Sequence, residues 1–131
     1  MVSVGDIVQI YCPSAGKDKY FICISEIDGE IAAQFLFISS GKSGITYQSD
    51  CVFPDTDFPC LPNSPTGKSI VSLSAFRKCN AEQLKVYKAK VLGRVSKAVA
   101  ATLKAAAEVS RVLTKPEKRI TLAALDVIIN F

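Results

Sequence analysis

The chain has 131 residues, of which 49% are hydrophobic, so its length and composition suit a single domain with one buried core. Its formal net charge is +4, and it contains no histidine. Histidine is the usual general base near neutral pH and the commonest metal ligand among side chains. Its absence therefore excludes serine–histidine triads, histidine-based ribonuclease chemistry and most zinc sites, and we expect neither a metal site nor a cofactor.

The first half of the chain predicts short strands. After a Gly-Asp turn, the apolar residues Val8 and Ile10 alternate with Gln9 as in a half-buried strand. The run from Tyr20 to Ser25 is too β-branched, aromatic and short for a helix, so we expect a central strand there. Asp28-Gly29 predicts a hairpin turn. The predicted strands cover residues 2–10, 20–25, 31–39 and 69–74, with weaker candidates at 45–47 and 51–53 and a turn at Gly41 and Gly44.

Prolines mark the end of this β-rich part. Four of the six prolines lie between Phe53 and Gly67. Because proline lacks the N–H donor that a strand ladder needs, this segment is predicted to be a loop or an irregular edge.

The second half of the chain predicts helices. Asn80 and Gln83 have the spacing of a capping box, and the segment Ala81 to Leu113 is rich in Ala, Leu, Lys and Glu without proline. Gly93 followed by Ser96 leaves two alternatives open, one long helix or a break between two helices. Thr114 and Glu117 predict a second capping box ahead of a short closing helix. We therefore divide the chain into a β-barrel part, 1–79, and a basic helical part, 80–131, packed as one compact domain.

Charge separates the same two halves. Residues 1–76 contain four lysines and eight acidic residues, whereas residues 77–131 contain twelve basic and four acidic residues. A basic half indicates a polyanionic partner such as nucleic acid, an acidic protein segment or a membrane surface. The alternative is that the lysines only make an Ala-rich helix soluble.

Two further features concern location. No apolar run approaches the roughly 20 residues that span a bilayer, and the first residues lack a basic leader and a cleavage site, so we expect a cytoplasmic protein without a membrane span. The five cysteines include no CxxC pair and are interpreted as free, mostly buried thiols.

Five segments, taken in order, resemble landmarks of the MazF/PemK toxins. They are the Gly-Asp start of a first strand, a second strand that begins with a cation, an apolar strand that ends in hydroxyl residues, a strand that ends in arginine, and a Gly-Arg-apolar-Ser segment. The segments are Gly5 to Val8, Lys19 to Ser25, Phe35 to Ser40, Val71 to Arg77 and Lys90 to Ser96.

The resemblance implies an α+β fold in which a small SH3-like antiparallel β-barrel precedes the helical region. Members of this family usually form homodimers, and many cut single-stranded RNA without a metal, using the 2′-hydroxyl of the RNA as the nucleophile. They are paired with an antitoxin whose acidic or extended tail covers the active groove. RNA or an acidic antitoxin-like protein is thus the expected partner.

The resemblance also implies the site residues. Lys19 matches the catalytic arginine of the family but is followed by Tyr20 instead of proline, and Ser39 or Ser40 matches the catalytic threonine. Lysine keeps the charge but loses the planar fork of a guanidinium. Arg77 and Arg94 match family positions; Arg77 either binds nucleic acid or anchors the junction between strand and helix. The expected nucleic-acid-binding residues are Arg77, Arg94, Lys97 and Lys104.

Three functions remain open at this point. The first is a toxin-like endoribonuclease, the second a catalytically degenerate module that binds nucleic acid or protein, and the third a membrane-surface role for the basic helix. Tyr11, Tyr20, Phe35 and Phe37 either stack on nucleobases or pack in the core of a small barrel.

Overall fold

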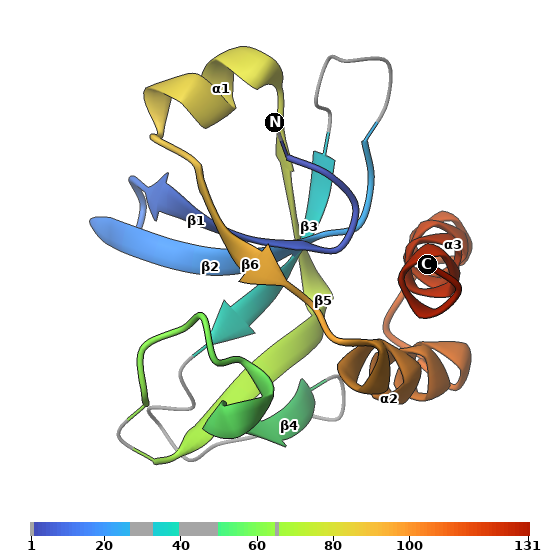
Figure 1. Cartoon of the computed structure of the whole chain (residues 1–131). Helices are drawn as coiled ribbons and strands as arrows, with labels where there is room; N and C mark the ends of the chain where they lie inside the picture. Colours follow the sequence, from blue (N-terminus) through green and yellow to red (C-terminus); the bar gives the residue numbers. More distant parts are fainter. Residues whose placement is uncertain (1, 27–32, 40–49, 65) are drawn as a thin grey trace.

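The structure is a computed structural model, and it describes residues 2–26, 33–39, 50–64 and 66–131, with residues 33–39 and 74–76 described by their backbone alone. The expected turns at Asp28-Gly29 and at Gly41 and Gly44, and the weak strand candidate at 45–47, lie outside these residues. Six strands, three helices and a short 3-10 turn follow one another along the described chain (Figure 1). They are β1 (Asp6–Cys12), β2 (Lys17–Cys23), β3 (Ala33–Ser39), β4 (Asp50–Pro54), the 3-10 turn (Asp55–Asp57), β5 (Lys68–Cys79), α1 (Ala81–Val86), β6 (Lys90–Arg94), α2 (Lys97–Glu108) and α3 (Lys115–Ile129).

The strands form one antiparallel sheet in the order β4-β5-β3-β2-β1-β6. The expected mixture of an antiparallel sheet and C-terminal helices is therefore confirmed. Within the described residues the two outer strands, β4 and β6, do not pair with each other, so the ladders do not close into a barrel. The run from Phe21 to Ile24 belongs to an inner strand, as its continuous apolar character predicted.

Successive residues of a strand point to opposite faces of the sheet, and both faces are covered here. One face packs against α2 and α3 and forms what we term the α2–α3 core. The other packs against α1 and forms the α1 core. The α2–α3 core includes Ile7, Ile22, Leu73, Leu103 and Leu125. The α1 core consists of Val2, Val8, Ile10, Phe21, Cys23, Cys79 and Leu84. This double coverage explains why four consecutive residues of the second strand segment, 21–24, are all buried.

The helix starts follow the predicted caps. The Asn80 side chain accepts a hydrogen bond from the backbone of Gln83, and the Gln83 side chain accepts one from the backbone N–H of Asn80. Thr114 and Glu117 form the same reciprocal pair at the start of α3, and Ser96 caps α2. Each cap satisfies N–H groups that have no partner within the first turn of a helix. No helix in the described part of the chain is long and apolar enough to cross a membrane.

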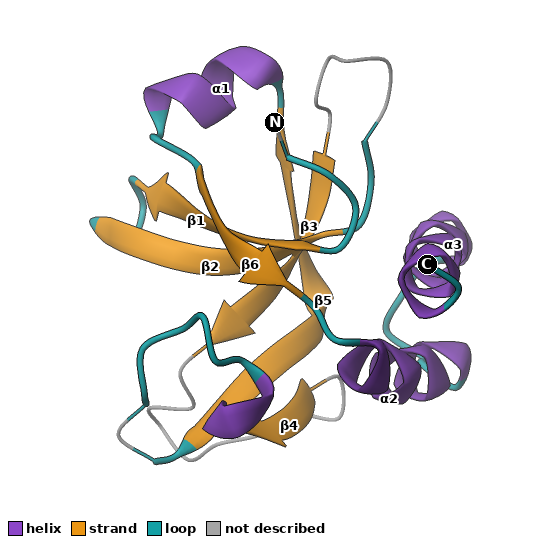
Figure 2. Cartoon of the chain, in the orientation of Figure 1, coloured by secondary structure: helices purple, strands orange, loops and turns teal. Residues whose placement is uncertain are grey.

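The prediction of helix throughout 81–113 is wrong in its middle. Helix α1 ends at Val86, Lys88 has a left-handed backbone with φ of 53°, and β6 then pairs with β1 (Figure 2). The periodicity of Val91 and Val95 suited a helix, yet pairing with the free edge of β1 outweighs that local preference. The predicted helical part therefore contributes a strand to the sheet, and Gly93 does not lie within a continuous helix.

An ion pair joins β6 to the start of β1. Arg94 Nη1 donates to the buried carboxylate of Asp6 at 2.9 Å, and Arg94 Nη2 donates to the Val4 carbonyl at 3.0 Å. Gly5, between these two partners, has φ of 93°. A Cβ atom on Gly5 would lie 2.9 Å from Arg94 Nη2 and 3.1 Å from the Ile128 side chain. The position thus needs glycine both for its backbone angle and for the approach of the guanidinium.

We expect Gly5→Ala to lower the free energy of unfolding by about 2–4 kcal/mol, because it adds backbone strain to a steric clash. Gly16→Ala is the matched control, since Gly16 also has a positive φ, 66°, but has open space where a Cβ would lie. Backbone strain alone predicts about 1 kcal/mol there. Urea unfolding of both variants measures the difference, and equal losses would contradict the role given to the Arg94 contact.

Candidate functional site

The first candidate catalytic residue, Lys19, lies on β2 and pairs with Ile10 of β1. It is half-buried. Because Phe21 faces the α1 core and side chains alternate along a strand, Lys19 lies on that same face of the sheet. On its other side, β2 pairs with β3, where Tyr20 is the partner of Ile38. Ser39 follows Ile38 in β3, just as Lys19 precedes Tyr20 in β2, so the backbones of Ser39 and Lys19 lie at neighbouring positions of the two strands. The Ser39 side chain and the whole of Ser40 lie outside the described residues.

Arg77, near the end of β5, reaches across the same face. Its guanidinium carbon lies 5.5 Å from the centre of the Phe21 ring and 5.2 Å from the centre of the Tyr87 ring. Its Nη2 donates to the backbone carbonyl of Tyr11 at 3.2 Å. Its Nη1 is buried and has no hydrogen-bond partner among the described atoms. The contacts with two rings and one carbonyl hold the guanidinium in place, so the anchoring role considered for Arg77 has direct structural support.

These contacts occur where β1 extends beyond β6. The ladder between β1 and β6 ends at the pair Gln9 and Lys90. Past that point, the Tyr11 N–H donates to the Tyr87 carbonyl at 3.0 Å, and the Tyr11 carbonyl accepts from Arg77. The N–H and carbonyl of Tyr11, which no longer pair with β6, are therefore satisfied by the Tyr87 carbonyl and the Arg77 side chain.

Lys19 and Arg77, which are 58 positions apart in sequence, thus lie toward the same end of one sheet face. Lys19 is paired with Ile10, and the Arg77 guanidinium binds the carbonyl of the next residue, Tyr11. Two cations at the same end of one sheet face contribute a positive potential that suits a phosphate group. The sequence predicted both residues, but it gave no sign of Tyr87, which contacts the arginine from the turn after α1.

A cysteine lies at the same end of the hairpin. Cys12, the last residue of β1, is half-exposed, and its Sγ lies 3.3 Å from the Ser14 hydroxyl. The hydrogen bond with Ser14, aided by the Ala15 backbone and the charge of Arg77, lowers the pKa of the Cys12 thiol. Burial instead raises the pKa of Cys23 to about 12, and it also raises the pKa of Cys51, Cys60 and Cys79.

We expect Cys12 to be the first of the cysteines to react with iodoacetamide, because the thiolate is the nucleophile and a lower pKa gives more thiolate at any pH below it. Its alkylation rate should level off at a lower pH than that of an ordinary thiol, whose pKa is about 8.5. Ser14→Ala should move that profile upward. Mass spectrometry of peptides after timed alkylation between pH 6 and pH 10 measures both effects, and faster labelling of Cys23 would contradict them.

The remaining predicted binding residues do not join this cluster. Arg94 is bound to Asp6, at the opposite end of β1 from Tyr11. Lys104 of α2 forms an ion pair with Asp126 of α3 at 2.7 Å, and this hydrogen bond raises the pKa of Lys104. Lys97 is exposed at the start of α2. The basic outer face predicted for the helices is therefore partly used in joining α2 to α3.

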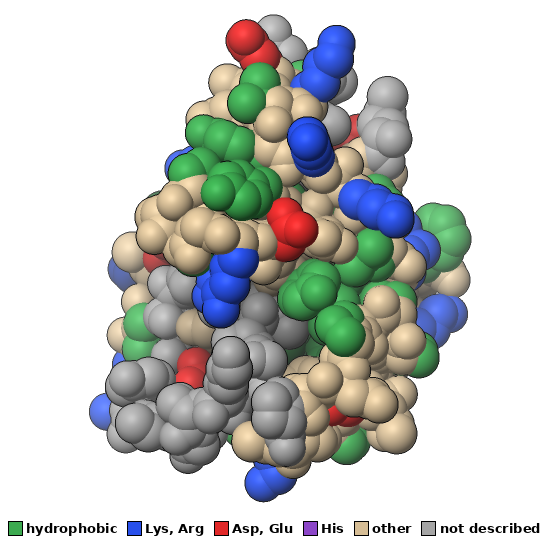
Figure 3. Space-filling view, turned by 90° about the vertical axis from the view of Figure 1, so that its left-hand side faces the viewer, with side chains coloured by type: hydrophobic (Ala, Val, Ile, Leu, Met, Phe, Trp, Pro, Cys, Tyr) green, Lys and Arg blue, Asp and Glu red, His purple; other side chains and the backbone are tan. Residues whose placement is uncertain are grey.

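The end of the β1–β2 hairpin exposes further basic and aromatic side chains. Tyr11 is 41% exposed, and the lysines at positions 17, 88 and 90 are exposed as well. Seen from the side on which this hairpin ends, Lys and Arg side chains border patches of hydrophobic side chains (Figure 3). Clusters of this kind, in which cations alternate with aromatic rings, are typical of surfaces that bind single-stranded nucleic acid.

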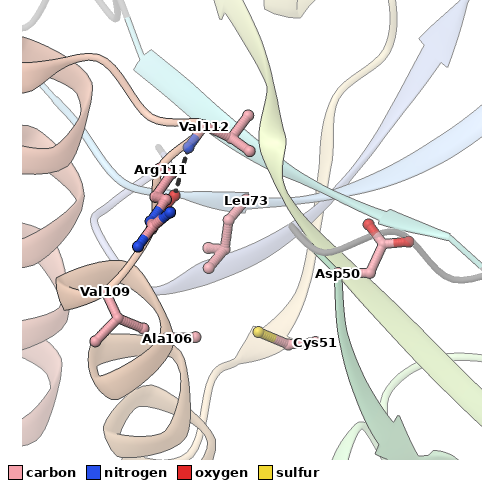
Figure 4. Close-up of a pocket in the computed structure, with 8 residues that line it drawn as sticks. Asp50, Cys51, Leu73, Ala106, Val109, Arg111 and Val112 are labelled. Atoms are coloured by element: carbon pink, nitrogen blue, oxygen red, sulfur yellow. Dashed lines mark hydrogen bonds between the residues drawn. The ribbon is translucent and has the colours of Figure 1, made fainter.

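A separate hollow of about 370 Å³ lies between the sheet and the link from α2 to α3. Leu73 and Cys51 line its sheet side, while Ala106 and Val109 line its helical side, with Asp50 and Arg111 on opposite walls (Figure 4). The Val112 N–H donates to the Ser110 hydroxyl at 3.2 Å and fixes the turn that borders it. None of the predicted site residues lines this hollow.

The part of the chain that the structure describes holds no group of three or more acidic, cysteine or histidine residues placed to bind a metal ion. The charged end of the β1–β2 hairpin is therefore the candidate site, with Lys19, Arg77 and Cys12 on its α1 side. The sequence matches no protein-family model, and no curated protein matches it.

Proposed function

We propose that the chain is a MazF/PemK-like protein of a toxin–antitoxin type system, which binds single-stranded RNA at the end of the β1–β2 hairpin and cleaves it without a metal ion. The observation that supports this most directly is the placement of Lys19 and Arg77 at the same end of one sheet face. Arg94, Lys97 and Lys104 are secondary candidates for RNA contact. Arg94 and Lys104 already bind carboxylates, and Lys97 lies at the start of α2, away from the hairpin end.

The proposal includes a divergent SH3-like barrel. Support comes from the curl of the sheet, which brings Arg77 of β5 to the backbone of β1 although β3 and β2 lie between them in the ladder order. Helix α1 follows β5 directly and leads to β6, which pairs with the outer edge of β1. The first and last parts of the sheet are thus linked through α1 and one arginine.

The proposed reaction needs only charge stabilisation and proton transfer. The 2′-hydroxyl of one ribose gives its proton to water as its oxygen bonds to the adjacent phosphorus. The bond from phosphorus to the 5′-oxygen of the next nucleotide breaks, and this oxygen takes a proton from water, which leaves a 2′,3′-cyclic phosphate and a 5′-hydroxyl. Lys19 offsets the charge that builds on the phosphate oxygens, with Ser39 or Ser40 as the hydroxyl donor. This chemistry suits a chain without histidine.

The proposed function also implies a homodimer and a protein partner. A cytoplasmic homodimer, neutralised by an acidic antitoxin-like protein over the basic hairpin end, is the expected assembly. The excess of basic residues in 77–131 supports an acidic partner.

A second candidate is a binding module without catalysis. Two observations favour it: Lys19 stands where the family has an arginine, and the Arg77 guanidinium is engaged by Phe21, Tyr87 and Tyr11. Such a module would hold RNA by its charge and aromatic surface but leave every phosphodiester intact.

Incubation of the purified protein with a fluorescent single-stranded RNA in the presence of EDTA separates these functions. The ribonuclease predicts fragments ending in cyclic phosphate, and a fully 2′-O-methylated RNA of the same sequence should be bound but not cut. Fluorescence anisotropy at 50 and 200 mM salt measures binding, which should weaken as salt rises. Intact RNA with salt-sensitive binding supports the binding module. If the protein neither cleaves nor binds the RNA at high protein concentration, both functions are rejected.

A further inference from the structure

Tyr11 is the most exposed aromatic residue described on the sheet, and its backbone is fixed on both sides. Its ring is 41% exposed. Its N–H donates to the Tyr87 carbonyl at 3.0 Å, and its carbonyl accepts from Arg77 Nη2 at 3.2 Å. Strand ends often fray, so these two bonds give an exposed ring a definite position at the end of β1.

Two exposed lysines belong to the backbone segment next to Tyr11. Lys90 pairs with Gln9, two residues before Tyr11 and therefore on the same face of the sheet. Lys88 directly follows Tyr87, the residue that accepts the Tyr11 N–H, and both lysines are exposed. Asp18 lies directly opposite Tyr11 in the ladder between β1 and β2. The Asp18 carboxylate accepts a hydrogen bond from the Gln9 side-chain amide at 2.8 Å. The backbone neighbours of Tyr11 named here thus carry two cations and one carboxylate.

We infer that Tyr11 is a stacking platform for one unpaired base of the RNA, that Lys88 and Lys90 hold the neighbouring phosphates, and that Arg77 is a positioning residue for Tyr11. This inference rests on the proposed RNA-binding function and extends it to the other face of the hairpin end. A strand of RNA that crosses the tip of the hairpin contacts Lys19 on the α1 side and Tyr11 on the other. Stacking accepts any base, so this contact adds affinity with little sequence preference.

The inference separates the roles of two residues that both lie at the tip. Arg77 has its guanidinium between Phe21 and Tyr87, and so acts on RNA through the Tyr11 backbone. Tyr11 contacts the base directly. Tyr11→Leu and Arg77→Lys, which keeps the positive charge, should both weaken binding of RNA that has bases, whereas RNA without a base at the contacted position should be insensitive to both.

The experiment compares wild type, Tyr11→Leu and Tyr11→Phe for binding to an eight-nucleotide single-stranded RNA, and to the same backbone made abasic throughout, by anisotropy at one salt concentration. We expect Tyr11→Leu to weaken binding of the normal RNA about 10-fold and Tyr11→Phe to retain wild-type affinity. On the abasic strand all three should bind equally. Equal affinity of wild type and Tyr11→Leu for the normal RNA overturns the inference.

Two further variants test the other roles. Lys88→Gln with Lys90→Gln should weaken both strands equally and reduce the dependence of affinity on salt. Arg77→Lys should weaken only the strand with bases, and if it does not fold, the pair of Tyr11 variants still decides. Cleavage and binding by wild type with no effect of Tyr11→Leu rejects this inference alone, whereas absence of RNA binding by wild type rejects it together with the proposed function.

Discussion

Phe58→Ala is expected to lower the free energy of unfolding by about 3–5 kcal/mol, which is the usual cost of removing a buried phenylalanine. Phe58 is 1% exposed although it lies in the proline-rich loop, and its ring meets that of Phe53 edge to face with centroids 5.6 Å apart. Both rings belong to the α2–α3 core. Alanine leaves a cavity at the point where the loop, the sheet and the helices meet, and denaturant unfolding measures the loss.

Phe131→Ala is the matched control, because Phe131 is 85% exposed and its ring centre lies 5.6 Å from the Arg94 guanidinium carbon. An exposed contact of that kind predicts a change of about 1 kcal/mol or less. Similar losses for the two variants would show that the loop does not pack as described.

For the proposed ribonuclease, Lys19→Ala is expected to reduce RNA cleavage by about 100-fold, the usual effect of removing one group that stabilises charge in a transition state. Lys19 occupies the position on β2 where the resemblance puts a catalytic cation. The Phe21 and Tyr87 rings hold the Arg77 guanidinium too firmly for it to replace Lys19. Initial rates with excess protein over RNA measure the effect, and circular dichroism shows whether the variant is folded.

Lys17→Ala serves as the control for charge alone. Lys17 lies two residues earlier on the same strand and face, pairs with Cys12 and is exposed. Loss of this surface charge should weaken binding modestly and leave the rate at saturating protein unchanged. Lys19→Arg, which restores a planar fork, should cleave at least as fast as wild type. Equal cleavage by Lys19→Ala and wild type would remove Lys19 from the mechanism.

Local signals in the sequence predicted the features that depend on neighbouring residues. The capping boxes at Asn80 and Thr114 were confirmed because the donors and acceptors of a capping box lie within one turn. The inner position of the second strand followed from its apolar run. The predicted strand at 69–74 is longer in the structure, where β5 continues to Cys79.

The features that the sequence did not reveal depend on distant partners. Residues 90–94 look helical by themselves and become a strand only because β1 offers an unpaired edge. Phe58 is buried despite the prolines around it, and Tyr87 meets Arg77 only after α1 turns the chain. In the candidate site the cations were predicted from a resemblance, whereas the fixed tyrosine at the end of β1 required the contacts themselves. Whether Ser39 and Ser40 act at the phosphate stays a prediction.

The pairing of β1 with β6 has a consequence for synthesis on the ribosome. Residues 6–12 leave the exit tunnel before residues 90–94, which pair with them on their outer edge. The Asp6 carboxylate therefore also lacks its partner Arg94 until these later residues have emerged. Until then a nascent chain exposes one open strand edge and an unmatched acid. A chain truncated before residue 90 should therefore depend on a chaperone or aggregate.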